Sequence, residues 1–276
     1  MTEEIMSSNV KIIRDSNPYV MDKLVDYNNI AALTRKNADF IEAIIRLDSN
    51  YKKESENKEP DNGFDLEKHS SKAEGLYCGS TKYWFEEMKN DSSKYQDCIW
   101  GAVVSIDRSN STHLETTLNG RYEMAKRIFE KCPNLESLKS ELSKEFFSRD
   151  DDHLIAVMLK EGLKSIKDDK DMYYLSFASK FCSCAAECLG TNPKYSKYDG
   201  VVSAALPEYY KAYCGEDKKK CEFKVNYNAS DKYRNRLKVY EEDSNAISEI
   251  LESIDEDNTL TRDEFDHIIW YGMKGN

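Results

Sequence analysis

The stretch from Lys170 to Tyr213 reads KDMYYLSFASKFCSCAAECLGTNPKYSKYDGVVSAALPEYYKAY, and it is the least charged long segment of a very polar chain. A helical pattern opens at Lys180, because apolar residues follow it at three- and four-residue intervals, at Phe181, Cys184, Ala185, Cys188 and Leu189. Ser176 and Ser179 precede the pattern and are candidates to cap the start of this helix. The pattern therefore predicts a helix with one buried face and a lysine at its beginning.

A second helix is expected after a return loop. Gly190 and Pro193 break the first helix, and an aromatic loop then runs to Asp199. Asp199 precedes the apolar run GVVSAAL, which is the position of an N-cap residue. Asp199 follows Lys180 by 19 positions, which is enough for the chain to double back. The spacing predicts that the lysine and the aspartate come together.

Such a pair has a chemical use. A lysine amine is a nucleophile only when it is deprotonated, and both a helix N-terminus and apolar neighbours disfavour the charged form. Phe177 and Phe181 are the apolar neighbours in this chain. An aspartate that caps a helix keeps its charge, and it can stabilise a cation that develops on an electrophilic carbon. The structural alternative is a solvated Lys180 and an Asp199 that only caps, and the residues alone leave both readings open.

The segment resembles the catalytic core of the helix-hairpin-helix DNA glycosylase superfamily, and most closely its 8-oxoguanine DNA glycosylase branch. Lys180 matches the lysine that begins the second hairpin helix of that branch, and Asp199 matches the aspartate at the next helix start. Cys184, one turn after the lysine, also suits the pattern. The ending FDHIIWYGMK, residues 265–274, is similar to uncharacterised bacterial proteins described as having the oxoguanine-glycosylase fold.

The resemblance implies a mainly α, multi-helical architecture of the helix-hairpin-helix glycosylase type, with room for a short strand. It implies base-excision repair of DNA at an oxidised or modified base such as 8-oxoguanine, by a glycosylase with AP lyase activity and without a cofactor. Lys180 would attack the sugar C1′ and form a Schiff base, and Asp199 would stabilise the cationic sugar. The candidate substrate-binding residues around the flipped base are Phe177, Phe181, Cys184, Trp84 and Trp270.

One departure from the family favours a different function. The family hairpin carries a glycine-rich turn whose backbone amides grip a DNA phosphate, whereas residues 175–179 read LSFAS and contain no glycine. A catalytically silent protein on the same fold, acting as a protein-binding or regulatory module, is therefore the alternative hypothesis.

The net charge of −11 argues against a general nucleic-acid binder, because phosphate contacts need clustered Lys and Arg. One basic face on an acidic protein is nevertheless sufficient for DNA binding. Two series could form such a face: Lys218 to Lys220, and Lys232, Arg234, Arg236 and Lys238. Solvated surface is the alternative reading of both.

Composition places the chain in a broad class. Hydrophobic residues make up 39% and charged residues 33%, which is typical of amphipathic helices with solvated outer faces. There is no run of 18 apolar residues and no apolar signal core near the start, so we expect a cytoplasmic protein without a membrane partner. The polar residues 48–75 predict a linker, with N-terminal helices in 1–75 and a glycosylase-like body in 76–276 that contains the 170–206 hairpin core.

Apolar periodicity predicts further elements along the chain. Helices are expected over 20–33, with Pro18 at its beginning, over 40–47, over 83–88, capped by Thr81, over 153–166, and over 233–254, capped by Ser230. Two further helices are expected within 121–147, broken at Pro133, and a last helix runs through Trp270 and opens with a Thr261–Glu264 capping box. Residues 98–106 are expected to form a helix or a strand, and residues 223–228 a strand.

Metal sites are not expected. Cys182, Cys184 and Cys188 lie on an apolar helix, where free cysteine packs as a small hydrophobe, although clustered thiols leave a metal site as the alternative. The four histidines show no His–His ligand spacing. Residues 255–266 resemble an EF-hand loop, but Leu260 and Asp266 replace the glycine and the glutamate that calcium binding requires.

Overall fold

The computed structural model describes residues 3–7, 10–17, 20–54, 79–109, 112–191, 195–215 and 223–274, and these are mainly helical, as predicted. Two compact units interleave along the chain. The first comprises Met1–Tyr77, Ala204–Lys220 and Ala246–Asn276, and the second comprises Cys78–Ser203 and Cys221–Asn245. The sequence, in contrast, suggested two consecutive parts that meet at residue 75.

The first unit opens with an antiparallel sheet of four strands in chain order: β1 (Glu3–Ser7), β2 (Val10–Arg14), β3 (Lys23–Leu24) and β4 (Tyr27–Ala31). Ile12 pairs with Leu24 and both are buried, whereas Lys11 and Lys23 are exposed. This two-residue alternation is that of a sheet with one covered face. The predicted helix over 20–33 is therefore wrong, because pairing with β2 decides the conformation of a short apolar run whose own spacing is ambiguous.

A buried polar cluster joins this sheet to α1 (Arg35–Glu54). The side chain of Asp22 is fully buried and pairs with Lys36 at 2.5 Å. The Asn37 amide donates to the backbone carbonyls of Asp22 and Ala32 at 3.0 and 2.7 Å. The helix predicted at 40–47 is confirmed, but it continues through residues 48–54, where a linker was predicted. Residues 55–75 of that predicted linker lie outside the described residues.

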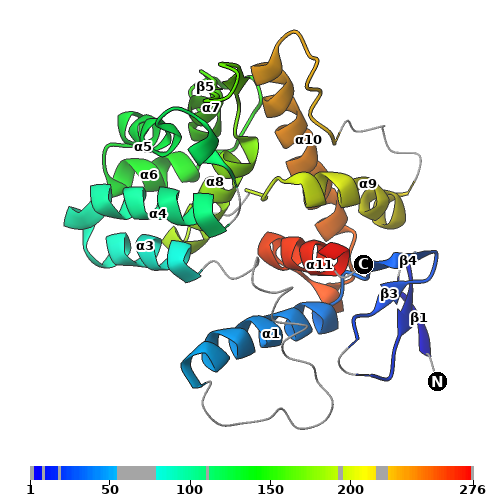
Figure 1. Cartoon of the computed structure of the whole chain (residues 1–276). Helices are drawn as coiled ribbons and strands as arrows, with labels where there is room; N and C mark the ends of the chain where they lie inside the picture. Colours follow the sequence, from blue (N-terminus) through cyan, green and yellow to red (C-terminus); the bar gives the residue numbers. More distant parts are fainter. Residues whose placement is uncertain are drawn as a thin grey trace. The chain divides into compact units, whose positions relative to one another are not determined.

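Helices also cover strand β4 of the first unit (Figure 1). The last helix, α11 (Arg262–Lys274), contacts β4 and α1, and it opens with the predicted capping box between Thr261 and Glu264. From α9 (Gly200–Cys214), the Tyr209 hydroxyl donates to the Ala31 carbonyl at 2.8 Å. The short 3₁₀ turn η3 (Glu256–Asn258) precedes α11.

The second unit is a helical body in which α8 (Leu175–Leu189) contacts the largest number of other helices. Four helices pack against α8: α3 (Gly79–Asn90), α4 (Tyr95–Ser109), α6 (Leu135–Leu142) and α7 (Leu154–Leu159). Small buried residues such as Ala178, Cys182 and Ala185 allow these neighbours to approach closely. Because α8 is buried on most sides, the lysine in its second turn lies in the interior of the unit.

The other elements of this unit are η1 (Ser92–Lys94), η2 (Leu114–Thr116), α5 (Gly120–Lys131), β5 (Leu163–Lys164), β6 (Asp171–Met172) and α10 (Lys232–Glu252), which continues into the first unit. Residues 98–106 are helical, and the two helices broken at Pro133 are confirmed. Residues 223–228 form no strand, so that prediction is wrong.

Three predicted helix boundaries need correction. The helix predicted over 153–166 ends at Leu159, and Ile166 is 67% exposed because the chain turns into the β5–β6 hairpin. At this turn a Cβ on Gly162 would lie 2.6 Å from the Asp171 Cβ, so only glycine fits. Helix α3 begins before Thr81, and Asp231 rather than Ser230 caps α10, since its side chain accepts from the Arg234 amide at 2.8 Å.

Candidate functional site

The structure brings Lys180 and Asp199 together, as the sequence predicted. The Lys180 Nζ lies 3.1 Å from the Asp199 Oδ2, and the side chains are 8% and 14% exposed. Lys180 projects from α8, and Asp199 lies directly before α9. The pair is therefore a buried ion pair at the point where the return loop rejoins the helical body.

The backbone of α9 orients Asp199. Its Oδ1 accepts from the amides of Val201 and Val202 at 2.9 and 3.0 Å, which confirms the predicted N-cap and leaves Oδ2 for Lys180. Burial raises the pKa of Asp199, but the charge of Lys180 and the two amides outweigh it, so the net pKa lies below its usual value. Asp199 is therefore a fixed anion at neutral pH.

Ser179, the residue before Lys180, binds Tyr198, the residue before Asp199, and so holds the return loop against α8. Its hydroxyl accepts from the Tyr198 amide at 3.0 Å and donates to the Ser176 carbonyl at 3.1 Å. The prediction that Ser176 and Ser179 cap the helix is wrong, because α8 begins at Leu175 with Tyr174 at the N-cap. Lys180 consequently lies in the second turn, where the helix dipole acts weakly on its amine.

The loop between Tyr195 and Asp199 is also fixed from its other side. The Tyr195 hydroxyl lies 3.0 Å from the His153 Nε2, and the Tyr240 hydroxyl donates to the Ser196 carbonyl at 3.1 Å. Burial lowers the pKa of His153 to about 4, so this imidazole is neutral at neutral pH. These bonds make the loop a rigid support for Asp199.

One face of α10 lies against the same loop. Arg236, Tyr240 and Asp243 occupy positions i, i+4 and i+7 of the helix and therefore share this face. The Arg236 guanidinium lies 4.9 Å from the ring centre of Tyr173 and 5.6 Å from that of Tyr227. Burial lowers the pKa of Arg236. The face thus carries two buried ionisable groups that act on Tyr198 of the return loop.

Asp243 is the group on this face without a partner. It is 2% exposed, and within the described part of the chain neither carboxyl oxygen has a hydrogen-bond partner. Burial, with a smaller effect from the charge of Glu242, raises the pKa of Asp243 to about 8. A buried polar group without a partner costs about 1–3 kcal/mol. The sequence did not single out Asp243 as a site residue. The only signal for it is its position at i+7 from Arg236 on the predicted helix.

The residues predicted to contact a flipped base are mostly committed to packing. Phe177 and Phe181 are fully buried and stack on each other at 6.2 Å, and Cys184 is also in the core. The Trp84 Nε1 donates to the Ser105 hydroxyl at 3.1 Å, and Trp270 belongs to the first unit. Phe177, Phe181 and Cys184 are therefore committed to the core and present no surface to a base.

The predicted basic series on α10 does not form an open cationic face. Arg234 pairs with Asp151 at 2.5 Å, Lys238 pairs with Glu242 at 3.6 Å, and Arg236 is buried. Among the described residues, Lys232 is the one member of this series that is exposed and forms no ion pair. The other series, 218–220, lies outside the described residues. The series on α10 is therefore largely neutralised.

Core packing explains the cysteines of α8. Cys182, Cys184 and Cys188 are buried in the hydrophobic core. Burial raises the pKa of Cys188 to about 12 and that of Cys182 well above its usual value, so these thiols stay protonated. Among the described residues, the group with metal-ligand geometry contains no cysteine.

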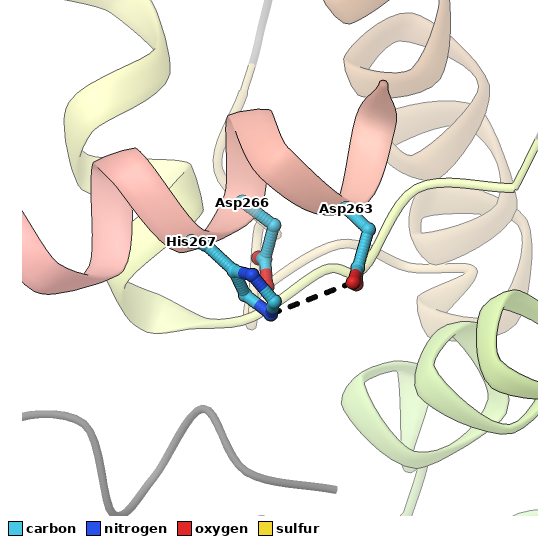
Figure 2. Close-up of side chains that lie close together, drawn as sticks. All are labelled: Asp263, Asp266 and His267. Atoms are coloured by element: carbon cyan, nitrogen blue, oxygen red, sulfur yellow. Dashed lines mark ion pairs between the residues drawn. The ribbon is translucent and has the colours of Figure 1, made fainter. Parts of the chain in front are cut away.

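That group lies on α11 in the first unit. Asp263, Asp266 and His267 project from one side of the helix, and their ligand atoms lie within 4.8 Å of one another (Figure 2). Carboxylate oxygens with an imidazole suit several divalent metals. However, His267 Nε2 pairs with Asp263 Oδ2 at 3.5 Å, and this ion pair accounts for the approach without a metal. A histidine metal site was not expected because the four histidines show no His–His ligand spacing. Such spacings do not detect a histidine that lies beside two aspartates.

No described helix is both long enough and apolar enough to cross a bilayer. Comparison with known proteins gives no match: no protein-family model, no curated protein and no solved structure matches this chain. The function must therefore be argued from the geometry of the Lys180–Asp199 pair.

Proposed function

We propose that the chain is a DNA glycosylase with AP lyase activity that uses Lys180 as its nucleophile. The observation that carries the proposal is the buried ion pair, in which the Lys180 Nζ and the Asp199 Oδ2 are 3.1 Å apart. Schiff-base chemistry uses a lysine in a water-poor site, and the fixed carboxylate beside it can stabilise a cationic sugar. Phe177 and Phe181, on the same helix as Lys180, are buried in the core.

The reaction balances with the groups of this site. The bond between C1′ and the base nitrogen breaks, its electron pair leaves with the base, and Asp199 stabilises the cationic sugar. The Lys180 amine then bonds to C1′, and opening of the sugar ring gives a protonated Schiff base. Of the three protons on the ammonium, one ends on the departing base, one on O4′ and one on the Schiff-base nitrogen. No oxidant, reductant or metal takes part.

The substrate must be unstacked before it can react. Lys180 is 8% exposed, so an intact duplex cannot reach its amine, and the proposal requires an extruded nucleotide. An abasic site needs least energy for this step, because it has no base to unpair. It is therefore the substrate on which the proposal is tested first.

Borohydride trapping tests the proposal. Labelled duplexes that carry an abasic site, 8-oxoguanine or an unmodified base are mixed with protein, reduced and resolved on a denaturing gel. We expect a covalent adduct with the abasic duplex that disappears in Lys180→Gln and persists in Lys82→Gln, since Lys82 lies on α3 and pairs there with Glu187. Absence of an adduct from the wild-type protein with every duplex would contradict the proposal.

A second candidate function is a catalytically silent module that binds protein. The neutralised basic series on α10 favours it, because Arg234 and Lys238 are paired with acidic residues and Arg236 is buried. Under this function the Lys180–Asp199 pair would only join the return loop to α8. A salt-dependent affinity for abasic DNA, with a loss of affinity as salt rises, would contradict it.

A further inference from the structure

Asp263, Asp266 and His267 form a cluster of metal-ligand groups in the first unit, whereas Lys180 and Asp199 belong to the second. The three residues occupy positions i, i+3 and i+4 of α11, which lie on one face of a helix. Ligands at i and i+4 of a helix are also a spacing with which proteins bind zinc. Figure 2 shows the three side chains on the same side of α11. The helix backbone therefore brings two carboxylates and an imidazole together.

The spacing of these groups suits a single ion. Their ligand atoms all lie within 4.8 Å of one another. Zinc binds imidazole nitrogen and carboxylate oxygen at about 2.0–2.2 Å, so two ligand atoms of a tetrahedral zinc ion lie roughly 3.4 Å apart. The Asp263 Oδ2 and the His267 Nε2, which are 3.5 Å apart, already have this separation. Small side-chain rotations are enough to place the Asp266 carboxylate around the same ion.

The charges of the cluster favour a divalent cation. Two carboxylates three residues apart on a helix repel each other, and one imidazolium offsets only one of them. Asp266 is 7% exposed, and the side chains of Asp263 and His267 are 23% and 12% exposed, so water screens the repulsion less than on an open surface. A divalent cation neutralises both carboxylates and leaves the imidazole in the neutral form that binds metals. The ion pair between Asp263 and His267 holds two of the ligands in place when no ion is bound.

We propose that Asp263, Asp266 and His267 bind a zinc ion, whose fourth coordination position is completed by a ligand from outside this group. Imidazole nitrogen with carboxylate oxygen is a donor set that zinc accepts, and three ligands from one cluster leave a position of the tetrahedron open. The ion joins the first two turns of α11, a helix that contacts β4 and α1. Because the folded helix brings the three ligands together, zinc stabilises the folded protein.

Titration of tag-free, chelator-treated protein with Zn²⁺ tests the proposal, by calorimetry and by thermal unfolding. We expect wild type to bind one zinc ion at this site with a Kd of roughly micromolar or below and to melt at a higher temperature with zinc. Asp266→Asn and His267→Gln each remove one ligand at similar volume. Both should weaken the affinity roughly 100-fold or more, because even the loss of a residue that only supports a ligand costs about 10- to 100-fold, and both should abolish the thermal shift.

A matched control removes a nearby carboxylate that is not a ligand. Asp257 is exposed in the preceding turn η3, so Asp257→Asn should bind zinc as wild type does. All variants should unfold cooperatively without zinc, at temperatures close to that of wild type, which shows that they fold. With two independent ligand substitutions, the test stands even if one variant is unstable.

Replacement of zinc by Co²⁺ then identifies the ligands. Cobalt bound through oxygen and nitrogen lacks the thiolate charge-transfer band that cysteine ligands produce. The proposal is overturned if wild type binds no zinc, if a folded ligand variant binds zinc as tightly as wild type, or if a thiolate band persists in both ligand variants. None of these readouts depends on borohydride trapping, so failure of this proposal and failure of the proposed function are distinguishable.

Discussion

Replacing Asp243 by asparagine should change how stability depends on pH. The pKa of Asp243 is raised from 3.8 to about 8 in the folded protein, so between these values the folded state retains a proton that the unfolded state has lost. The contribution of protonated Asp243 to the free energy of unfolding is therefore fully present below pH 4, and it declines as pH rises toward 8. Each pH unit in this window costs roughly 1.4 kcal/mol, or about 2.7 kcal/mol between pH 5 and 7.

The groups that face Asp243 support this sign. Glu242, on the same helix, disfavours a second negative charge, and Tyr198 approaches from the return loop as a neutral phenol. The one cation on the same face, Arg236, lies over aromatic rings and forms no ion pair with Asp243 in the described residues. Within the described part of the chain, neither carboxyl oxygen of Asp243 thus has a hydrogen-bond partner that would compensate its ionisation.

Urea unfolding, followed by tryptophan fluorescence, measures the difference directly. Trp84 and Trp100 lie in the same unit as Asp243 and report its unfolding. Between pH 5 and pH 7 the asparagine variant should gain about 2–3 kcal/mol of stability relative to wild type. A difference between the two proteins that stays constant from pH 5 to 8 would show that the carboxyl group is hydrated or paired, and would refute the reasoning.

Three further predictions concern the same unit. Lys180→Met should lower the free energy of unfolding by about 3 kcal/mol, because it leaves Asp199 buried without its cation; a loss below 1 kcal/mol in chemical denaturation would mean that the pair is hydrated. Gly101→Ala should destabilise by about 1–3 kcal/mol, since a Cβ would lie 2.4 Å from the Trp84 ring, whereas Gly200→Ala has no neighbour within 4 Å and should be nearly neutral; equal melting temperatures would contradict this. Chelation with EDTA should leave the yield of the borohydride adduct unchanged, because the proposed chemistry needs no metal; a metal-restored loss would disprove that mechanism.

Local signals in the sequence were sufficient for most helices and for the central pair. The cap at Asp199, the break at Gly190 and the capping box at Thr261 each depend on a few neighbouring residues, and the structure confirms all three. Because Lys180 and Asp199 are joined by a short return loop, their spacing was enough to predict that they meet.

Long-range packing decided the features that the sequence did not reveal. Strand β3 pairs with β2 and β4 pairs with β3, and the spacing of Val20 and Leu24 contains no trace of these partners. The start of α8 at Leu175 likewise reflects burial on several helices at once. Whether Asp243 has a partner depends on every element that surrounds it, so no local pattern could show that it has none.

Peptide mapping of the reduced adduct tests the central claim most directly. Wild-type protein would be trapped on abasic DNA with borohydride and digested with nuclease and protease, and mass spectrometry would then locate the sugar remnant. The proposed function predicts a remnant on Lys180, the lysine that lies 3.1 Å from Asp199. A remnant on any other lysine, or the absence of a modified peptide, would contradict it.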